Sequence, residues 1–348
     1  MIRIALLSLL ATFGPALAGG PGEVVLYHAP DEAIARPLIE AFEKKTGVTV
    51  RAVGPGTGAS IVDPADRVRA EKDAPACDVV WSGGVAQVAA LGRDGLLEAH
   101  VSESLSDWPE ALRDENRLWH AFALRPRVMV FNAGDPPLVS NQEETRPARH
   151  MRDFFHPNFR DVFVMSYPHF GATQDHIGLM NATLGPAGIQ LWAFQMRKQD
   201  LRLVKGDAEV VRVVAQRGAR AGLVSAEFVR LARKRGEPVD MIPIRHDRYD
   251  FSGQNVTDAF GPVLVPHAVA RIKGGPNGQN AALLIDFLLS PEAEEMLARG
   301  DGALLPARPE VAAKFPELAT EDAAPLDCRT LPAQTEEGLS TFLRAFPR

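Results

Sequence analysis

Short apolar runs alternate with amphipathic segments along most of the chain. Residues 23–27 form an apolar run that predicts a buried strand, and residues 32–46 carry apolar side chains at the spacing of a helix. Another apolar run follows at residues 48–53. A strand, a helix and a second strand in this order predict a parallel βαβ unit with a right-handed crossover.

The same alternation continues towards the C-terminus. Further strands are predicted at residues 78–81, 120–124, 128–132, 162–165, 221–224, 263–265 and 268–272. Further helices are predicted at residues 66–72, 82–91, 151–155, 174–180, 186–198, 210–216, 227–234 and 280–289, with another from residue 292. The pattern as a whole predicts an α/β fold.

Small and polar residues follow several of the predicted strands. In open α/β sheets, ligands bind at the carboxyl ends of the strands, because loop amides and helix N-termini meet there. Four loops therefore form the predicted site, at residues 28–31, 54–60, 82–84 and 170–176. The candidate ligand-binding residues in these loops are His28, Asp31, Thr57, Gly58, Ser60, Ser82, Gly83, Gly171, Ala172, Thr173 and His176.

The chemistry of these loops favours an anion. Residues 171–173 offer backbone N–H groups, a hydroxyl and a helix N-terminus, a combination that suits a phosphate, phosphonate, sulfate or carboxylate. Each glycine loop taken by itself is better explained as a tight turn, but the convergence of the loops on one sheet edge favours ligand binding. His28 and His176 either donate to the anion or are ordinary structural histidines. Arg127, like Arg125, is a candidate for a bidentate contact to an anionic group or for an ion pair at a hinge.

The N-terminus has the pattern of an export signal. A short positive start at residues 1–3 precedes an apolar run from Ile4 to about Ala16, and Ala16-Leu17-Ala18 matches a cleavage site. The run is too short to span a bilayer, and no cysteine follows it for lipid attachment. We therefore expect residues 1–18 to be removed and the mature protein to be free in the periplasm. The alternative is the apolar first helix of a cytosolic domain.

Composition and motifs narrow the function. A length of 348 residues allows two domains, and a net charge of −6 gives no reason to expect nucleic acid or an anionic membrane as a partner. The sequence lacks G-x-S-x-G, H-E-x-x-H and a histidine cluster with metal spacing, so we expect no enzyme activity, bound metal or cofactor. Cys77 and Cys328 either form one disulfide or stay free.

Several stretches, in their order, resemble class II periplasmic solute-binding proteins of ABC importers. This group includes iron(III)-, thiamine-, spermidine- and organophosphate-binding members. The stretches that carry the resemblance are residues 24–50, 78–84, 91–97, 125–132, 168–173, 214–223, 282–291 and 305–309. In the family, the stretch at residues 125–132 is a strand that crosses the hinge.

The resemblance implies a two-lobed fold, in which each lobe is a mostly parallel sheet flanked by helices and two strands form the hinge. Lobe 1 is then expected at residues 19–127 and 262–348, and lobe 2 at residues 128–261. The partners are expected to be a small solute and an ABC permease in the inner membrane, and the protein to be a monomer. Glu227 lies where the family reaches its ligand, so it either binds an amine or closes an ion pair between the lobes.

The ligand set departs from that of the iron-binding members. These place His, Glu and two adjacent Tyr at positions that correspond here to about Asp31, Gly83, Glu227 and Phe228. The chain has three tyrosines, and none are adjacent. A hard ferric ion prefers anionic oxygen ligands, so we expect a small anionic organic solute that bears a phosphate or phosphonate. Ferric iron or another metal with a non-standard ligand set is the alternative. The alternatives of another class are a sensor partner of a membrane kinase and a periplasmic hydrolase. The sequence leaves the ligand's identity open.

Overall fold

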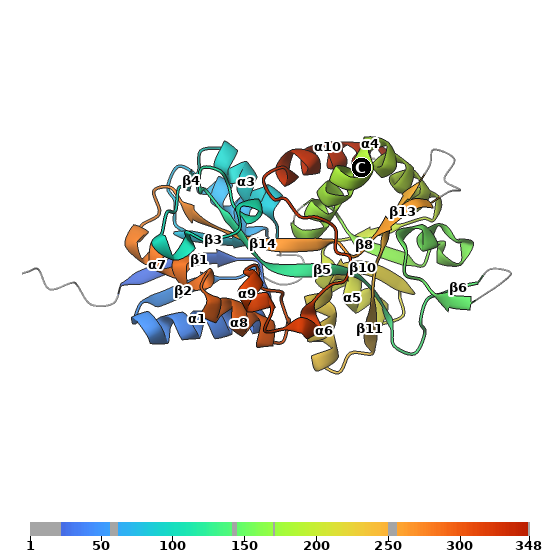
Figure 1. The fold of residues 1–348 in the computed structure, drawn as a ribbon, viewed down its shortest axis with the longest axis horizontal. Coiled ribbons are helices and arrows are strands. Elements are labelled where there is room, and N and C mark those ends of the chain that lie inside the picture. The colour runs from blue at the N-terminus through green and yellow to red at the C-terminus, as the bar shows by residue number, and fades with distance from the viewer. Residues whose placement is uncertain (1–21, 56–61, 141–144, 170, 250–255, 347–348) are drawn as a thin grey trace, which may run out of the picture.

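The structure is a computed structural model, and it describes residues 22–55, 62–140, 145–169, 171–249 and 256–346. The predicted signal peptide at residues 1–18 and the candidate residues Thr57, Gly58 and Ser60 lie outside these ranges. Figure 1 shows two α/β lobes side by side, with the long strands β5 and β14 running between them.

The described elements follow one another in a largely alternating order. The strands are β1 (Glu23–His28), β2 (Thr49–Val53), β3 (Val79–Ser82), β4 (Leu97–Glu98), β5 (His120–Asn132), β6 (Leu138–Ser140), β7 (Thr145–Pro147), β8 (Phe163–Ser166), β9 (Arg202–Val204), β10 (Ala221–Ser225), β11 (Val239–Pro243), β12 (His246–Tyr249), β13 (Val256–Phe260) and β14 (Leu264–Ile272). The α-helices are α1 (Glu32–Thr46), α2 (Pro64–Ala70), α3 (Val85–Arg93), α4 (Gly171–Lys198), α5 (Asp207–Ala215), α6 (Ala226–Lys234), α7 (Gly278–Leu288), α8 (Pro291–Arg299), α9 (Pro309–Ala312) and α10 (Leu331–Ala345).

One continuous sheet connects the lobes. Its strand order among the described residues is β2-β1-β3-β14-β5-β10-β8-β9, with β11 paired to β5 and β4 paired to β14. The pairs β1–β2 and β1–β3 in lobe 1 are parallel, as are β8–β10 and β8–β9 in lobe 2. In contrast, β5 is antiparallel to β14 in lobe 1 and to β10 in lobe 2. The predicted two-lobed α/β fold is thereby confirmed.

The hydrophobic core divides where β5 passes from one lobe to the other. Residues 121–123 of β5 pack in the lobe 1 core with β1, β3 and β14, whereas residues 128–130 pack in lobe 2. Between them, the backbone N–H of Arg127 donates to the carbonyl oxygen of Val263, just before β14, at 2.9 Å. These two segments are therefore the crossing strands between the lobes.

The C-terminal helix α10 returns to lobe 2. Phe342 of α10 is fully buried in the lobe 2 core and lies against Trp192 of α4, with ring centroids 5.3 Å apart. Figure 1 shows α10 lying along α4. The predicted lobe boundaries place residues 262–348 together in lobe 1, and they stay a prediction. The packing of α10 nevertheless ties the end of the chain to both lobes, because α10 also contacts α3.

The two cysteines are separate in the structure. Cys77 and Cys328 are both buried and free, so the disulfide, one of the two alternatives, is not formed. Burial raises the pKa of the Cys77 thiol to about 12 and raises the pKa of Cys328 well above its usual value. Both residues pack as small apolar side chains in the lobe 1 core. No described helix has the length and apolar character needed to cross a bilayer.

Candidate functional site

A cavity of about 350 Å³ opens between the lobes, at the carboxyl ends of strands from both. On the lobe 1 side it is lined by residues 29–31, which join β1 to α1, by residues 62–64 at the start of α2, and by Gly83 after β3. On the lobe 2 side it is lined by residues 171–173 at the start of α4 and residues 205–208 at the start of α5. We call this hollow the interlobe cavity.

The structure brings some of the predicted site residues together and leaves others aside. Those that line the interlobe cavity are Asp31, Gly83, Gly171, Ala172, Thr173 and Glu227. Those among the described residues that do not line it are His28, Ser82, Arg127 and His176. Their expected roles as ligand contacts stay predictions.

Both predicted histidines are buried in protein contacts. The Nδ1 atom of His28 lies 3.1 Å from the carbonyl oxygen of Pro30, and burial lowers the pKa of His28 despite the nearby carboxylate of Glu32. The Nε2 atom of His176 lies 2.7 Å from Nε2 of His246, and burial, then the charge of His246, lowers its pKa well below the ordinary value. Both positions fit the structural alternative raised from the sequence.

Arg127 binds a carboxylate of the protein itself. Its Nη1 atom donates to Oδ2 of Asp207 at 2.6 Å, and its Nη2 atom donates to the hydroxyl of Thr173 at 3.1 Å. The Ser166 hydroxyl and the Ser225 backbone N–H also donate to this carboxylate. Burial alone raises the pKa of Asp207, but the Arg127 charge and these donors outweigh it, so the pKa is lowered. Asp207 therefore fills an anion-binding cradle in the wall of lobe 2.

Arg125 and Glu227 form the ion pair between the lobes that the sequence offered as one alternative for Glu227. Nη1 of Arg125 on β5 donates to Oε1 of Glu227 on α6 at 3.0 Å, and both side chains are at least 97% buried. The remaining Arg125 nitrogens donate to the carbonyl oxygens of Gly83, Val265 and Pro266. Burial raises the pKa of Glu227, and the Arg125 charge opposes that rise. Oε2 of Glu227 has no hydrogen-bond partner among the described residues.

His267 on β14 is a second buried polar group at the interlobe cavity. Its Nδ1 atom lies 3.2 Å from the carbonyl oxygen of Ser82, so Nδ1 carries the proton and Nε2 is the acceptor. Burial, followed by the charge of Arg125, lowers the pKa of His267 well below its usual value, and the ring is neutral. Nε2 of His267 also has no hydrogen-bond partner within the described part of the chain.

Two aspartates cap the helices that begin at the lobe 1 wall. The Asp31 carboxylate accepts from the backbone N–H of Ala33 at 2.9 Å, and the Asp63 carboxylate accepts from that of Ala65 at 2.8 Å. Burial raises the pKa of Asp63 to about 6. Both side chains add negative charge to the lobe 1 wall, because N-caps at the starts of α1 and α2 are where aspartate is favoured.

The loop at residues 82–84 is closed by a side chain from α4. The Asp175 carboxylate accepts from the backbone N–H groups of Val85 and Ala86, at 2.5 and 3.1 Å, in the first turn of α3. Asp175 thus occupies the N-terminus of α3, an anion-binding position that the sequence analysis predicted for a ligand. At the corresponding ends of α5 and α6, no described residue provides a side-chain cap.

Sequence reasoning missed several residues that shape the interlobe cavity. Asp63, Lys205, Asp207 and His267 line it, and none of them stands in a recognisable motif. The one available signal was position, because Lys205 and Asp207 follow β9, a strand too short to stand out as an apolar run. His267 interrupts the apolar pattern of β14, and the sequence does not indicate which way its side chain points.

The positions that correspond to the iron ligands of the family do meet in space. Asp31, Gly83, Glu227 and Phe228 all line the interlobe cavity. Glycine and phenylalanine supply no side-chain ligand, and Glu227 is paired with Arg125. Within the described ranges, no group of three or more His, Cys, Asp or Glu side chains is placed to hold a metal ion.

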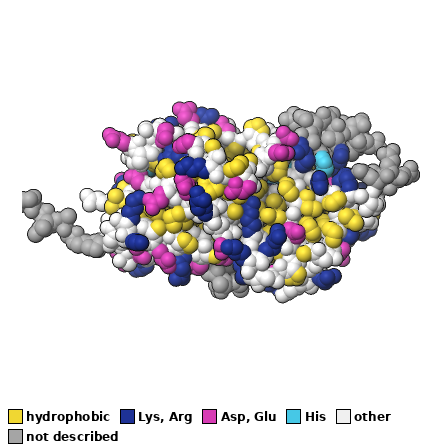
Figure 2. Space-filling model, turned by 60° about the horizontal axis from the view of Figure 1, so that its bottom comes forward, with side chains coloured by type: hydrophobic (Ala, Val, Ile, Leu, Met, Phe, Trp, Pro, Cys, Tyr) yellow, Lys and Arg dark blue, Asp and Glu magenta, His cyan; other side chains and the backbone are white. Residues whose placement is uncertain are grey.

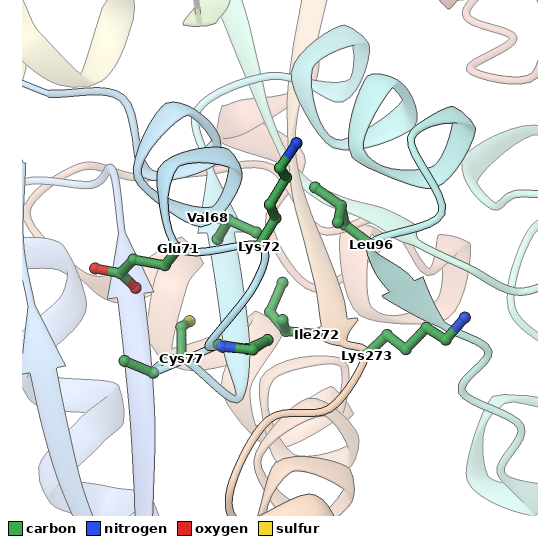
Figure 3. A pocket seen from close by; sticks show the side chains of 9 residues that line it. Val68, Glu71, Lys72, Cys77, Leu96, Ile272 and Lys273 are labelled. Atoms are coloured by element: carbon green, nitrogen blue, oxygen red, sulfur yellow. The ribbon is translucent and has the colours of Figure 1, made fainter.

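A second hollow lies on the far side of lobe 1, near Cys77. Its volume is about 10 Å³, enough for roughly one water molecule. Figure 3 shows the ammonium ends of Lys72 and Lys273 pointing away from it. On the outer face in Figure 2, basic and acidic side chains are interspersed, without a continuous basic field of the kind that binds nucleic acid. The interlobe cavity is therefore the candidate solute site.

Comparisons with known proteins agree with this geometry. The chain is 25% identical over 305 residues to a putative 2-aminoethylphosphonate-binding periplasmic protein of Salmonella typhimurium, covering 84% of this chain and 82% of that protein. It is 22% identical over 292 residues to iron uptake protein A1 of Synechocystis, covering 82% and 77%. The structure of the periplasmic binding protein AfuA from Actinobacillus pleuropneumoniae, with fructose-6-phosphate bound, superimposes with a TM-score of 0.73 at 18% identity, covering 93% of this chain and 98% of that one. Residues 24–300 match the bacterial extracellular solute-binding proteins, and the chain belongs to that family.

Proposed function

We propose that this protein is the periplasmic solute-binding component of an ABC importer, and that it closes over a small anionic organic solute bearing a phosphate or phosphonate. The observation that carries the proposal is the interlobe cavity, which is walled by loops and helix N-termini of both lobes. Its volume of about 350 Å³ lies in the range of small-molecule sites.

The anionic group of the solute is placed at the lobe 2 wall. The first-turn N–H groups of a helix have no partner within that helix. The starts of α4 and α5 face the interlobe cavity through Gly171, Ala172 and Ala208, and Lys205 adds a positive charge beside them. Gly171 adopts a φ of 65°, a conformation that costs glycine little and brings the backbone to the cavity without a side chain. Backbone donors held in this way need no reorganisation to bind an anion.

We also propose a periplasmic location for the protein and a membrane permease as its partner. The export signal read from residues 1–18 supports a periplasmic location, and the name of the Salmonella relative supports a phosphonate ligand. The crossing strands β5 and β14 allow the lobes to close by a hinge motion, and the closed form delivers the solute to a membrane permease. We expect the protein to act as a monomer and to have no enzyme activity.

A ferric-iron carrier is the second candidate. It is favoured by the meeting of Asp31 and Glu227 at one cavity, and by the relative named as an iron uptake protein. Two carboxylates and a bound anion or water are the ligands available to such an ion. A sensor partner of a membrane kinase uses the same binding site, so the test below applies to it without change.

The test is a thermal-shift screen of ligand-stripped protein with ethylphosphonate, glycerol phosphate, inorganic phosphate and ferric citrate. A solute at 100 times its dissociation constant stabilises the fold by about 2.7 kcal/mol. We expect at least one phosphonate or phosphate ester to raise the melting temperature, and ferric citrate to leave it unchanged. A shift with ferric citrate alone overturns the proposal in favour of the second candidate.

A pair of lysine variants locates the site. Lys205→Gln removes the positive charge at the interlobe cavity, so it weakens binding of the phosphate ester. Lys72→Gln removes an equal charge beside the small hollow of Figure 3 and leaves binding unchanged. Equal affinities for the two variants place the anion elsewhere.

A further inference from the structure

The interlobe cavity carries more negative than positive side chains. Asp31, Asp63, Asp207 and Glu227 line it, together with Arg125 and Lys205. Asp207 is neutralised from behind by Arg127, and Glu227 is paired with Arg125 through only one of its oxygens. Asp31 and Asp63 accept from helix N–H groups and carry their charges without an ion-pair partner in the described structure. A solute that is anionic throughout meets repulsion at the lobe 1 wall.

Two acceptors at this cavity lack donors. Oε2 of Glu227 and Nε2 of His267 have no hydrogen-bond partner among the described residues, although each side chain is about 98% buried. Buried polar atoms are nearly always hydrogen-bonded, and an unpartnered one costs about 1–3 kcal/mol. Glu227 pairs with Arg125, and the Arg125 charge also acts on His267. The N–H groups of Arg125 are themselves directed at Glu227 Oε1 and at carbonyl oxygens. The described part of the chain therefore supplies acceptors here and no donor to match them.

We propose that the solute carries, besides its anionic group, a cationic ammonium that Glu227 and His267 receive, so that the ligand is a zwitterion. This inference rests on the proposed function, because it concerns the other end of the same solute. An ammonium has three donors and no acceptor, which complements a carboxylate oxygen and a neutral imidazole nitrogen. Its charge also offsets the acidic lobe 1 wall, while the phosphate or phosphonate lies at the starts of α4 and α5.

The geometry excludes the reverse arrangement, in which the anionic group lies at Glu227 and His267 and the ammonium lies at the lobe 2 wall. The Ser166 hydroxyl and the Arg127 guanidinium donate to the Asp207 carboxylate, and the Thr173 hydroxyl accepts from Arg127, so the cradle in lobe 2 has no place for a second anion. Glu227 and His267 offer an anion only lone pairs. The anionic group is thus confined to the backbone N–H groups and Lys205, and the ammonium to the acceptor pair.

The experiment compares two probes that differ by one amino group. Binding of 2-aminoethylphosphonate and of ethylphosphonate to the ligand-stripped protein is measured by calorimetry, with inorganic phosphate as a third probe. We expect 2-aminoethylphosphonate to bind at least tenfold more tightly than ethylphosphonate. Equal affinities overturn the inference and leave the proposed function standing. If none of the three probes binds, the proposed function fails and the inference fails with it.

A matched pair of variants tests whether Glu227 receives the ammonium. Glu227→Gln keeps the size of the side chain but loses the charge, so the affinity ratio of the two phosphonates falls towards one. Glu294→Gln is the control, because Glu294 is also buried, pairs with an arginine and has an Oε2 atom without a hydrogen bond, but does not line the cavity. The Glu294→Gln variant should keep the wild-type affinity ratio of the two phosphonates. A Glu227→Gln protein that retains the ratio overturns the assignment, and the wild-type comparison stands even if this variant does not fold.

Discussion

The Asp175 carboxylate on α4 accepts a hydrogen bond from the backbone N–H of Val85, the first residue of α3, at 2.5 Å. The two residues are 90 positions apart in the chain. Asp175 is fully buried, and it joins a helix that packs in both lobes to a helix of lobe 1. This contact lies at the edge of the interlobe cavity, because Gly83 and Gly171, which line that cavity, approach each other beside it.

The Asp175 contact makes stability depend on pH. Burial raises the pKa of Asp175 from 3.8 to about 7, against the lowering effect of the Val85 and Ala86 N–H groups. Between about pH 4 and pH 7 the folded protein therefore holds a proton that the unfolded chain has released. The stability due to this group is present below about pH 4 and is lost as the pH rises to about 7, by about 1.4 kcal/mol for each pKa unit.

The measurement is the free energy of unfolding of the wild type and of Asp175→Asn from pH 4 to pH 8, by urea denaturation. We expect the advantage of the wild type over the variant to shrink across this window. A difference that stays constant with pH shows that Asp175 titrates alike in the folded and unfolded states.

Gly84 leaves no room for a side chain at the same contact. A Cβ atom on Gly84 would lie 2.9 Å from Oδ2 of Asp175 and 3.0 Å from the carbonyl oxygen of Gly171. Gly84→Ala should therefore lower the free energy of unfolding by about 1–3 kcal/mol, the usual cost of overpacking. Gly206→Ala is the control, since a Cβ atom there meets nothing within 4 Å and the residue is extended. Urea denaturation that finds the two variants equally stable contradicts the tight contact.

Breaking the buried Arg127–Asp207 ion pair is expected to lower the free energy of unfolding far more than breaking an exposed ion pair. Arg127→Met leaves a buried carboxylate without its cation, which costs about 3–5 kcal/mol. The double variant Arg127→Met/Asp207→Asn should recover part of that loss, because no uncompensated charge remains. Arg160→Met breaks the exposed pair with Asp200 and should cost about 1 kcal/mol or less. Equilibrium unfolding in urea ranks the three variants, and a double variant no better than Arg127→Met alone contradicts the argument.

The free cysteines give a prediction about reactivity. A thiol reacts as the thiolate, and burial raises the pKa of both Cys77 and Cys328. We expect a thiol reagent to leave the native protein unmodified and to label two sites after unfolding, as seen by mass spectrometry. A reducing agent should not change the melting temperature. Failure to label the unfolded, non-reduced chain means that the two sulfurs are joined.

Local elements could be predicted from the sequence because their causes are local. The helix predicted at residues 32–46 is α1 with the same bounds, since Asp31 caps its start and Gly47, with φ of 72°, ends it. In contrast, the two extended segments predicted at residues 120–124 and 128–132 form the single strand β5. Arg125 and Arg127 interrupt the apolar pattern, but the strand continues through them because it pairs with β14 and β10 there. The burial of each arginine is offset by a buried carboxylate partner.

The sequence by itself determined the α/β alternation and the resemblance to solute-binding proteins. It also predicted a candidate site at the strand ends, where Asp31, Gly83, Gly171, Ala172, Thr173 and Glu227 line one cavity. Only the tertiary structure decided which charged side chains are paired with one another within the protein. Glu227 lies 102 residues from Arg125 and Asp207 lies 80 residues from Arg127, so no local pattern announces either pair. Burial and charge pairing depend on residues that are distant in the chain, whereas helix and strand periodicity depends on neighbours. Glu227 and His267 each keep an acceptor without a partner among the described residues, and this feature, from which the chemistry of the solute is inferred, arises only from the packed fold.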